Sequence, residues 1–334
     1  MNEILDYRAL PKVELHLHLD CSMSYAVAKK INPQLAYERF QSDFIAPDKC
    51  RDLADYLKRA DEQLALLQTK EHLRWAVQDL FKQLSAENVI YAEIRFAPLL
   101  HVKEGLKPEE VVAVVNQAVE EGVQKTGIKG GLILATLRNY SEAQSLQTAA
   151  LVKEFKGSSV VGFDIAGDEA AWPIDAHRSA FDFAHEHQLN ITAHAGEARG
   201  AESVWETLEC FHPHRIGHGV RSVEDPALVD DLKDKNIHLE ICPTSNIQTN
   251  VFDTMAKHSV DQLYRAGISL SIHTDTRTIS DTTLSREYQL LTEHFAWTKA
   301  HFRYCNLEAI QHAFTDEETK ARLKERVMEA YGEG

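Results

Sequence analysis

The chain lacks several features that mark other classes of protein. Its 334 residues contain no tract of eighteen consecutive apolar residues, so a membrane-spanning helix is not expected. The first residues, MNEILDYRALPK, lack the charged-then-apolar pattern of a secretory signal. We therefore expect a soluble cytoplasmic protein that has no membrane partner.

Paired cysteines and excess positive charge are also missing. The five cysteines are odd in number and form no CxxC pair, which favours scattered reduced thiols over a disulfide framework or a Cys-rich zinc site. The formal net charge is −15. Because nucleic acid is bound by basic surfaces, it is not an expected partner, but a small neutral nucleoside remains compatible with this charge.

No repeat, low-complexity tract or Gly/Ser linker divides the chain, so we expect one domain over residues 1–334. Hydrophobic residues make up 44% of it, enough to fill a large core. Eight short strand candidates alternate with longer, mostly helical segments. They lie at 13–19, 89–97, 131–137, 160–166, 190–195, 215–219, 237–242 and 268–274.

Eight strands with helical crossovers predict a closed α/β barrel of the (β/α)8 TIM type. The alternative is an open doubly wound sheet, but no GxGxxG follows a strand. A longer insertion, roughly 22–75, follows the first strand, and the chain from about 285 is predicted to form extra C-terminal helices. Within the insertion, 53–67 is expected to pack as a helix over the barrel mouth.

Polar residues gather at the predicted strand ends, where a barrel of this kind carries its active site. In VELHLHLD the first strand places His16 and His18 on one face, with Val13, Leu15 and Leu17 on the other. Later strands end in HAGE, GHG and HTDT, which contribute the further candidates His194, Glu197, His218 and Asp275.

This residue set predicts a metal site. Neutral imidazoles from His16, His18 and His194 with one carboxylate from Asp275 suit zinc, and less specifically iron, nickel or manganese. A metal with a coordination position left for water lowers the pKa of that water toward neutrality. Asp275 is expected to be a long ligand that also accepts the proton of the water.

Two further residues are candidates for proton transfer. Glu197 lies three residues past His194 and is free to give or take a proton. His218 lies between two glycines and is expected to orient the nucleophilic water. Glu14, deeper on the same strand face, is expected to be a buried acid paired in the barrel floor rather than a catalytic group.

The chain resembles the adenosine deaminase family of the amidohydrolase superfamily over nearly its whole length. The matching motifs, in order, are PKVELHLHLD, YAEIRFAP, VVGFDIAGDE, HAGE, RIGHG, LEICPTSN, HTD and TLSREYQLL. The resemblance implies one Zn²⁺ per chain and hydrolytic deamination of adenosine, and of 2′-deoxyadenosine, to the inosine form plus ammonia, as in purine salvage.

The resemblance also implies individual roles. His16, His18, His194 and Asp275 would be the zinc ligands, and His218 would help to activate the water. Glu197 would protonate purine N1 while hydroxide attacks C6, which requires a carboxylic acid of raised pKa. The backbone N–H of Gly167 would contact N3, and Asp20 would bind a ribose hydroxyl.

The sequence departs from the family pattern at two positions. Thr276 stands where a second aspartate would contact N7, and a hydroxyl can either donate to that nitrogen or accept. Cys21 stands where glycine is usual, beside Asp20. In the helix expected over the mouth, Leu53, Tyr56 and Leu57 are candidates for lining the purine pocket.

These departures leave three functions open. The first is deamination of adenosine. The second is deamination of another 6-aminopurine, such as adenine, an N6-substituted adenine or aminodeoxyfutalosine. The third is a non-catalytic nucleoside-binding protein, which would have no need of Glu197. The oligomeric state does not follow from the sequence.

Overall fold

The computed structural model describes residues 5–332, and within them the predicted eight strands are present. The strands are β1 (Lys12–His18), β2 (Val89–Phe96), β3 (Lys129–Leu137), β4 (Val160–Ala166), β5 (Thr192–Ala195), β6 (Arg215–His218), β7 (His238–Ile241) and β8 (Leu270–Ile272). All pairings between neighbouring strands are parallel, in the orders β1-β2-β3-β4 and β5-β6-β7-β8.

Two seams join these half-barrels into a ring. At the first seam, Phe163 of β4 forms an isolated parallel bridge with Ile191, just before β5. At the second, Leu17 of β1 forms a parallel bridge with Asp275, just after β8. The N–H of His18 donates to the carbonyl of Asp275 over 2.7 Å, so β1 is hydrogen-bonded to the segment that directly follows β8. The predicted barrel is therefore closed.

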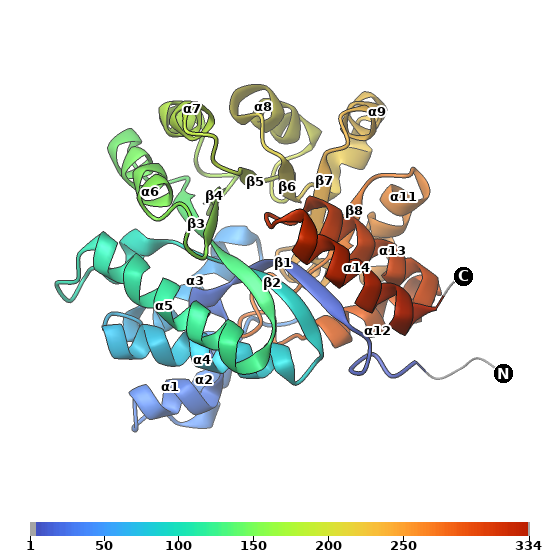
Figure 1. The fold of residues 1–334 in the computed structure, drawn as a ribbon. Coiled ribbons are helices and arrows are strands. Elements are labelled where there is room, and N and C mark those ends of the chain that lie inside the picture. The colour runs from blue at the N-terminus through green and yellow to red at the C-terminus, as the bar shows by residue number, and fades with distance from the viewer. Residues whose placement is uncertain (1–4, 333–334) are drawn as a thin grey trace.

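Helices cover the outside of the ring and cap one end. They are α1 (Tyr25–Ile31), α2 (Tyr37–Phe44), α3 (Leu53–Leu66), α4 (Lys70–Ser85), α5 (Pro108–Thr126), α6 (Glu142–Glu154), α7 (Arg178–Glu186), α8 (Ala201–Phe211), α9 (Pro226–Asp234), α10 (Pro243–Gln248), α11 (Val260–Arg265), α12 (Leu284–Phe295), α13 (Lys299–His312) and α14 (Glu317–Tyr331). Short 3₁₀ turns lie at Leu19–Cys21, Pro98–His101, Asp175–His177, Val220–Glu224 and Met255–Lys257. Figure 1 shows α6 to α9 in an arc outside the strands.

The predicted insertion and C-terminal helices are both present. The insertion after β1 forms α1, α2, α3 and the start of α4, and the C-terminal part forms α12, α13 and α14. Local signals begin several of these helices: the side chains of Asp52, Thr69 and Thr283 each accept a backbone N–H of the first turn. No helix in the described part of the chain is both long and apolar enough to cross a membrane.

The inside of the barrel is filled by charged side chains rather than by branched apolar ones. Glu93, Arg95, Asp164, Arg215 and Glu240 are all fully buried. Arg95 pairs with Asp164 at 2.9 Å and with Glu240 at 2.6 Å, and Arg215 pairs with Glu240 at 2.6 Å and with Glu93 at 2.5 Å. The apolar core lies instead between the outer strand face and the helices, where Leu15 and Leu17 pack.

Glu14 is a buried and paired acid, as predicted, but its partners are not those of the barrel interior: a register shift in β1 separates it from Leu17, and it aligns with Ala92 of the apolar core. Its carboxylate accepts the backbone N–H of Thr274 over 2.7 Å and lies 3.4 Å from the guanidinium of Arg277. Arg277 also pairs with Glu87 at 2.6 Å. Glu14 therefore ties the start of the chain to the segment after β8.

A second buried acid, Glu287 on α12, makes folding stability depend on pH. It accepts the N–H of Thr244 over 3.1 Å and the hydroxyl of Thr282 over 2.6 Å, and burial raises its pKa to about 7. Between about pH 4.5 and 7 the unfolded chain loses this proton while the folded chain keeps it, so stability falls as the pH rises through that window.

Glu287→Gln is therefore expected to raise the free energy of unfolding at pH 8 by about 3 kcal/mol. The reason is that the parent must ionise a buried carboxyl group at this pH, whereas the amide carries no charge. At pH 4.5 the variant and the parent should match. Denaturant unfolding at both pH values measures the difference. Glu293→Gln, on the exposed side of the same helix, is the control, and equal effects of the two substitutions would contradict the assignment.

Candidate metal and purine site

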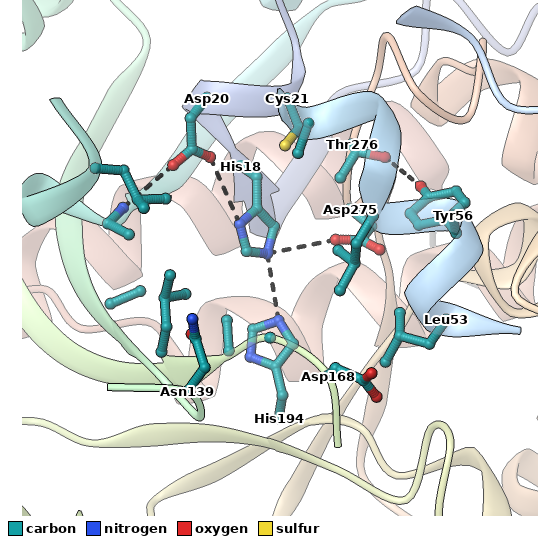
Figure 2. A pocket seen from close by; sticks show the side chains of 18 of the residues that line it. His18, Asp20, Cys21, Leu53, Tyr56, Asn139, Asp168, His194, Asp275 and Thr276 are labelled. Atoms are coloured by element: carbon teal, nitrogen blue, oxygen red, sulfur yellow. Dashed lines mark hydrogen bonds and ion pairs between the residues drawn. The ribbon is translucent and has the colours of Figure 1, made fainter. Parts of the chain in front are cut away.

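A cavity of about 380 Å³ opens at the carboxyl ends of the strands. Its floor contains His18, His194, Glu197, His218 and Asp275, which come from β1 and from the ends of three strands in the second half-barrel, β5, β6 and β8. The cavity is roofed by α3 (Figure 2). Strand ends and insertion thus meet where the sequence predicts the site.

Four of the predicted residues form a compact set of metal-binding atoms. His16, His18, His194 and Asp275 each place a ligand atom within 4.8 Å of the others. The Nε2 atoms of His18 and His194 are 3.2 Å apart, and Oδ1 of Asp275 lies 3.4 Å from His18 Nε2 (Figure 2). The same Oδ1 lies 3.5 Å from His16 Nε2.

The buried Nε2 of His16 shows that this set fits a cation. It has no hydrogen-bond partner in the structure, whereas Nδ1 of the same ring lies 2.8 Å from Oε2 of the Glu240 carboxylate. A carboxylate partner places the proton on Nδ1 and leaves the lone pair of Nε2 directed at the cluster. Imidazole nitrogens with one carboxylate oxygen are ligands that zinc and similar divalent metals prefer.

A second layer of carboxylates holds these rings, and sequence reasoning missed it. Asp164 lies 3.2 Å from Nδ1 of His194, as Glu240 lies beside His16. Arg95 joins the two carboxylates. Although burial alone would raise the pKa of Glu240, Arg95 and Arg215 hold it well below its ordinary range. In the sequence, Asp164 and Glu240 could have been recognised only as carboxylates at inward positions of β4 and β7.

Asp275 lies on the barrel seam and has an unusual backbone. Its φ of 62° is in the left-handed region, which a residue other than glycine adopts only where the surroundings hold it. The hydroxyl of Ser245 donates to Oδ2 over 2.7 Å, which leaves Oδ1 facing the histidines. The seam and Ser245 thus set the direction of this carboxylate.

Glu197 and His218 lie beside the histidine cluster. Oε2 of Glu197 is 3.5 Å from Nε2 of His218. Burial raises the pKa of Glu197 well above its usual range, and the nearby carboxylates of Asp275 and Glu169 raise it further. This shift favours the protonated carboxylic acid, the form of Glu197 that can serve as a proton donor.

His218 is neutral. Burial and the neighbouring His16 lower its pKa well below the ordinary value. Its Nδ1 lies 3.2 Å from the amide nitrogen of Asn246, whose oxygen lies 3.2 Å from Nε2 of His258. If the Asn246 amide donates to Nδ1, the proton of His218 is on Nε2 and points to the cavity.

The three residues predicted to contact substrate also lie at the cavity. Asp20, Gly167 and Thr276 all line it. Asp20 accepts the N–H of Ala97 over 3.2 Å, and its Oδ1 is 3.9 Å from Nδ1 of His18 (Figure 2). Gly167 has φ of 99°, a conformation that L side chains rarely adopt.

The two departures from the family pattern also line the cavity. Cys21 is buried next to Asp20. The hydroxyl of Thr276 is hydrogen-bonded to the hydroxyl of Tyr56 (Figure 2). The Tyr56 hydroxyl also lies 2.7 Å from that of Ser280. The position at which the family pattern has a second aspartate therefore carries a group of uncharged hydroxyls.

The helix predicted over 53–67 is present as α3, and it covers the mouth. Leu53, Tyr56 and Leu57, the predicted pocket residues, all line the cavity. The rim also includes Asn139 and the half-exposed Trp172, which no sequence pattern singled out. Among the residues that line the described cavity there is no Lys or Arg.

Comparisons with known proteins agree with this architecture. A family model described as adenosine deaminase matches residues 11–330. The adenosine deaminase of Enterococcus faecalis is 34% identical over 330 residues, covering 97% of this chain and 98% of that protein. The N6-mAMP deaminase MAPDA of Arabidopsis is similar in structure, with a TM-score of 0.87 and 25% identity over 97% of this chain and 99% of that chain.

An adenine deaminase from Arthrobacter aurescens has the same fold. Its TM-score against this chain is 0.89 at 24% identity, covering 96% of this chain and 99% of that chain.

Proposed function

Because the chain belongs to the adenosine deaminase family, we propose that it removes the 6-amino group of adenosine and of 2′-deoxyadenosine by hydrolysis. The observation that carries the proposal is the meeting of a metal-type cluster and the protonated Glu197 in one cavity. A binding protein would have no use for this pair, which argues against a non-catalytic function.

We propose that His16, His18, His194 and Asp275 hold one Zn²⁺. The donor set and the unpartnered Nε2 of His16 support this assignment. When bound, such a metal supplies the Lewis acidity that makes a water molecule nucleophilic near neutral pH. Asp164 and Glu240 would orient two of the rings toward it.

The protons are moved by Glu197, with His218 beside it. Glu197 gives its proton to purine N1, which lets the ring accept electrons as the C6–O bond forms. The C6–N6 bond then breaks; one proton of the attacking water returns to Glu197 and the other leaves on ammonia, while N1 keeps the proton that Glu197 gave. His218, neutral with Nε2–H toward the cavity, orients the water and stabilises the developing charge, while Asp275 accepts a proton.

The remaining cavity residues would hold the nucleoside. The N–H of Gly167 would donate to N3, Thr276 would meet N7, and Asp20 would bind a ribose hydroxyl. Their common position on the cavity wall supports these roles. The absence of Lys and Arg from the residues that line the described cavity favours a nucleoside over a nucleotide.

A second candidate is another 6-aminopurine, such as adenine or an N6-substituted adenine. Thr276 and Cys21 favour keeping it open, because they alter the wall that the base and sugar would touch. The similar solved structures named above include deaminases of adenine and of N6-mAMP.

An assay of ammonia release across adenosine, 2′-deoxyadenosine, adenine, N6-methyladenosine and aminodeoxyfutalosine separates the candidates. We expect the two nucleosides to give the highest kcat/KM. Turnover of another member of the panel without turnover of adenosine would replace the first proposal by the second.

Metal removal is expected to abolish this activity reversibly. Dialysis against a chelator should remove one metal per chain and lower the rate at least about 100-fold, and one equivalent of Zn²⁺ should restore it. Elemental analysis and activity are measured on the same samples. Full activity in protein shown to be metal-free would refute the metal assignment.

We also propose that residues 1–334 form one domain and that the protein acts in the cytoplasm. The family match over residues 11–330 supports a single domain. All five cysteines are free thiols, which suits a reducing compartment.

A further inference from the structure

The loop between β5 and α8 is held by one carboxylate, that of Glu169. Four consecutive backbone N–H groups, those of residues 196–199, donate to it over 2.6–3.0 Å. The hydroxyl of Ser203 in α8 is a fifth donor. This loop carries Glu197, the proposed proton donor.

The carboxylate of Glu169 is only 2% exposed. Among the described residues Glu169 makes no ion pair with a Lys or Arg, although the buried Arg138 is a nearby positive charge, so the five hydrogen-bond donors hold the carboxylate directly. Successive N–H groups around an anion form a nest, and each would lose a partner if the anion were removed.

Arg221 holds the opposite side of the same loop. Its N–H donates to the carbonyl of Gly196 over 3.1 Å, and its Nη1 donates to the carbonyl of Ala198 over 2.9 Å. Gly196 has φ of 67°, and a Cβ there would lie 2.5 Å from Val204. The backbone on both sides of Glu197 is thus fixed, and its side chain points to His218 in the cavity.

We propose that Glu169 is the positioning residue for Glu197: its carboxylate holds the 196–199 backbone so that Glu197 reaches the N1 edge of a bound purine. The proposal rests on the proposed function. Gly167, two residues before Glu169, lines the same cavity. One short segment after β4 therefore serves both a contact with the base and the placement of the acid.

Three variants test the proposal. Glu169→Ala removes all five hydrogen bonds, and Glu169→Gln keeps an amide oxygen that can accept the three N–H groups now bound to Oε2. Ser203→Ala removes only the hydroxyl donor and is the matched control. We expect Glu169→Ala to lower kcat for adenosine about 100-fold, Glu169→Gln about tenfold, and Ser203→Ala less than threefold.

A pair of unreactive ligands separates positioning from general support of the pocket. Inosine has a nitrogen at position 1 that can hydrogen-bond to Glu197, and 1-deazainosine has a C–H there. The parent protein is expected to bind inosine about tenfold more tightly, from competitive inhibition constants. Glu169→Ala should lose this preference while its affinity for 1-deazainosine changes less than threefold.

Two results would overturn the proposal. One is a preference for inosine that survives in Glu169→Ala. The other is a parallel loss of both ligands, because Glu169 would then support the whole pocket. If Glu169→Ala does not fold, the test rests on Glu169→Gln. An unchanged kcat for adenosine and an unchanged preference for inosine over 1-deazainosine in that variant would contradict the proposal. A parent protein that releases no ammonia from adenosine would instead refute the proposed function.

Discussion

Glu197→Gln is expected to lower kcat for adenosine by about 10³-fold while leaving the fold, the metal content and ligand binding nearly unchanged. The carboxamide has the size of the carboxyl group but cannot give a proton to N1. Burial raises the pKa of the parent acid and favours its neutral form, which the carboxamide matches in charge. Stopped assays over hours measure the residual rate, and the inhibition constant of 1-deazainosine reports binding.

Glu209→Gln is the matched control for this variant. Glu209 lies on α8, which follows the same loop, but its side chain is exposed, and its substitution should leave kcat within twofold. A Glu197→Gln enzyme with more than about a tenth of the parent rate would remove Glu197 from the proposed mechanism.

Arg95→Met is expected to have the largest effect on stability. The guanidinium of Arg95 is fully buried and pairs with two fully buried carboxylates, Asp164 and Glu240. Removing one partner of a buried ion pair leaves uncompensated charge and costs about 3–5 kcal/mol. Those two carboxylates also orient His16 and His194, so zinc affinity should fall about 10–100-fold.

Two measurements check this prediction: denaturant unfolding of the metal-free protein and competition for Zn²⁺ with a chelator of known affinity. The control is Arg74→Met, which breaks the half-exposed pair between Arg74 and Glu121 and should cost less than about 1 kcal/mol. Equal free energies of unfolding for the two variants would contradict the prediction that the buried ion pairs of Arg95 stabilise the protein more than the half-exposed pair of Arg74.

Local patterns predicted the strands and most of the proposed site. The alternation in VELHLHLD places His16 and His18 on an inward face, and the strand order brings His194 and Asp275 to them. The predicted ends of the strands were less accurate. The strand expected at 190–195 begins at Thr192, because Ile191 lies at the seam and makes only an isolated bridge.

The supporting groups depend on contacts that no local pattern encodes. Glu240 lies 224 residues from His16 along the chain, and the two meet only when the ring is closed. Glu169 lies in a motif that is recognisable in the sequence. Its proposed positioning role, however, depends on hydrogen bonds from four N–H groups some thirty residues later in the chain. Tyr56 was identified as a pocket residue, whereas its hydrogen bond to Thr276 required the packing of α3 over the mouth.

The seam between β1 and Asp275 has a consequence for when the proposed metal ligands can come together during synthesis. The N–H of Asp275 donates to the carbonyl of His16 over 3.0 Å, and the N–H of His18 donates to the carbonyl of Asp275. Because a chain emerges from the ribosome N-terminus first, the proposed ligands His16 and His18 are made early and Asp275 is made last of the four. An unfinished chain can offer the histidines but not the complete chelate. The complete set of four proposed ligands therefore forms only when the segment after β8 docks on β1.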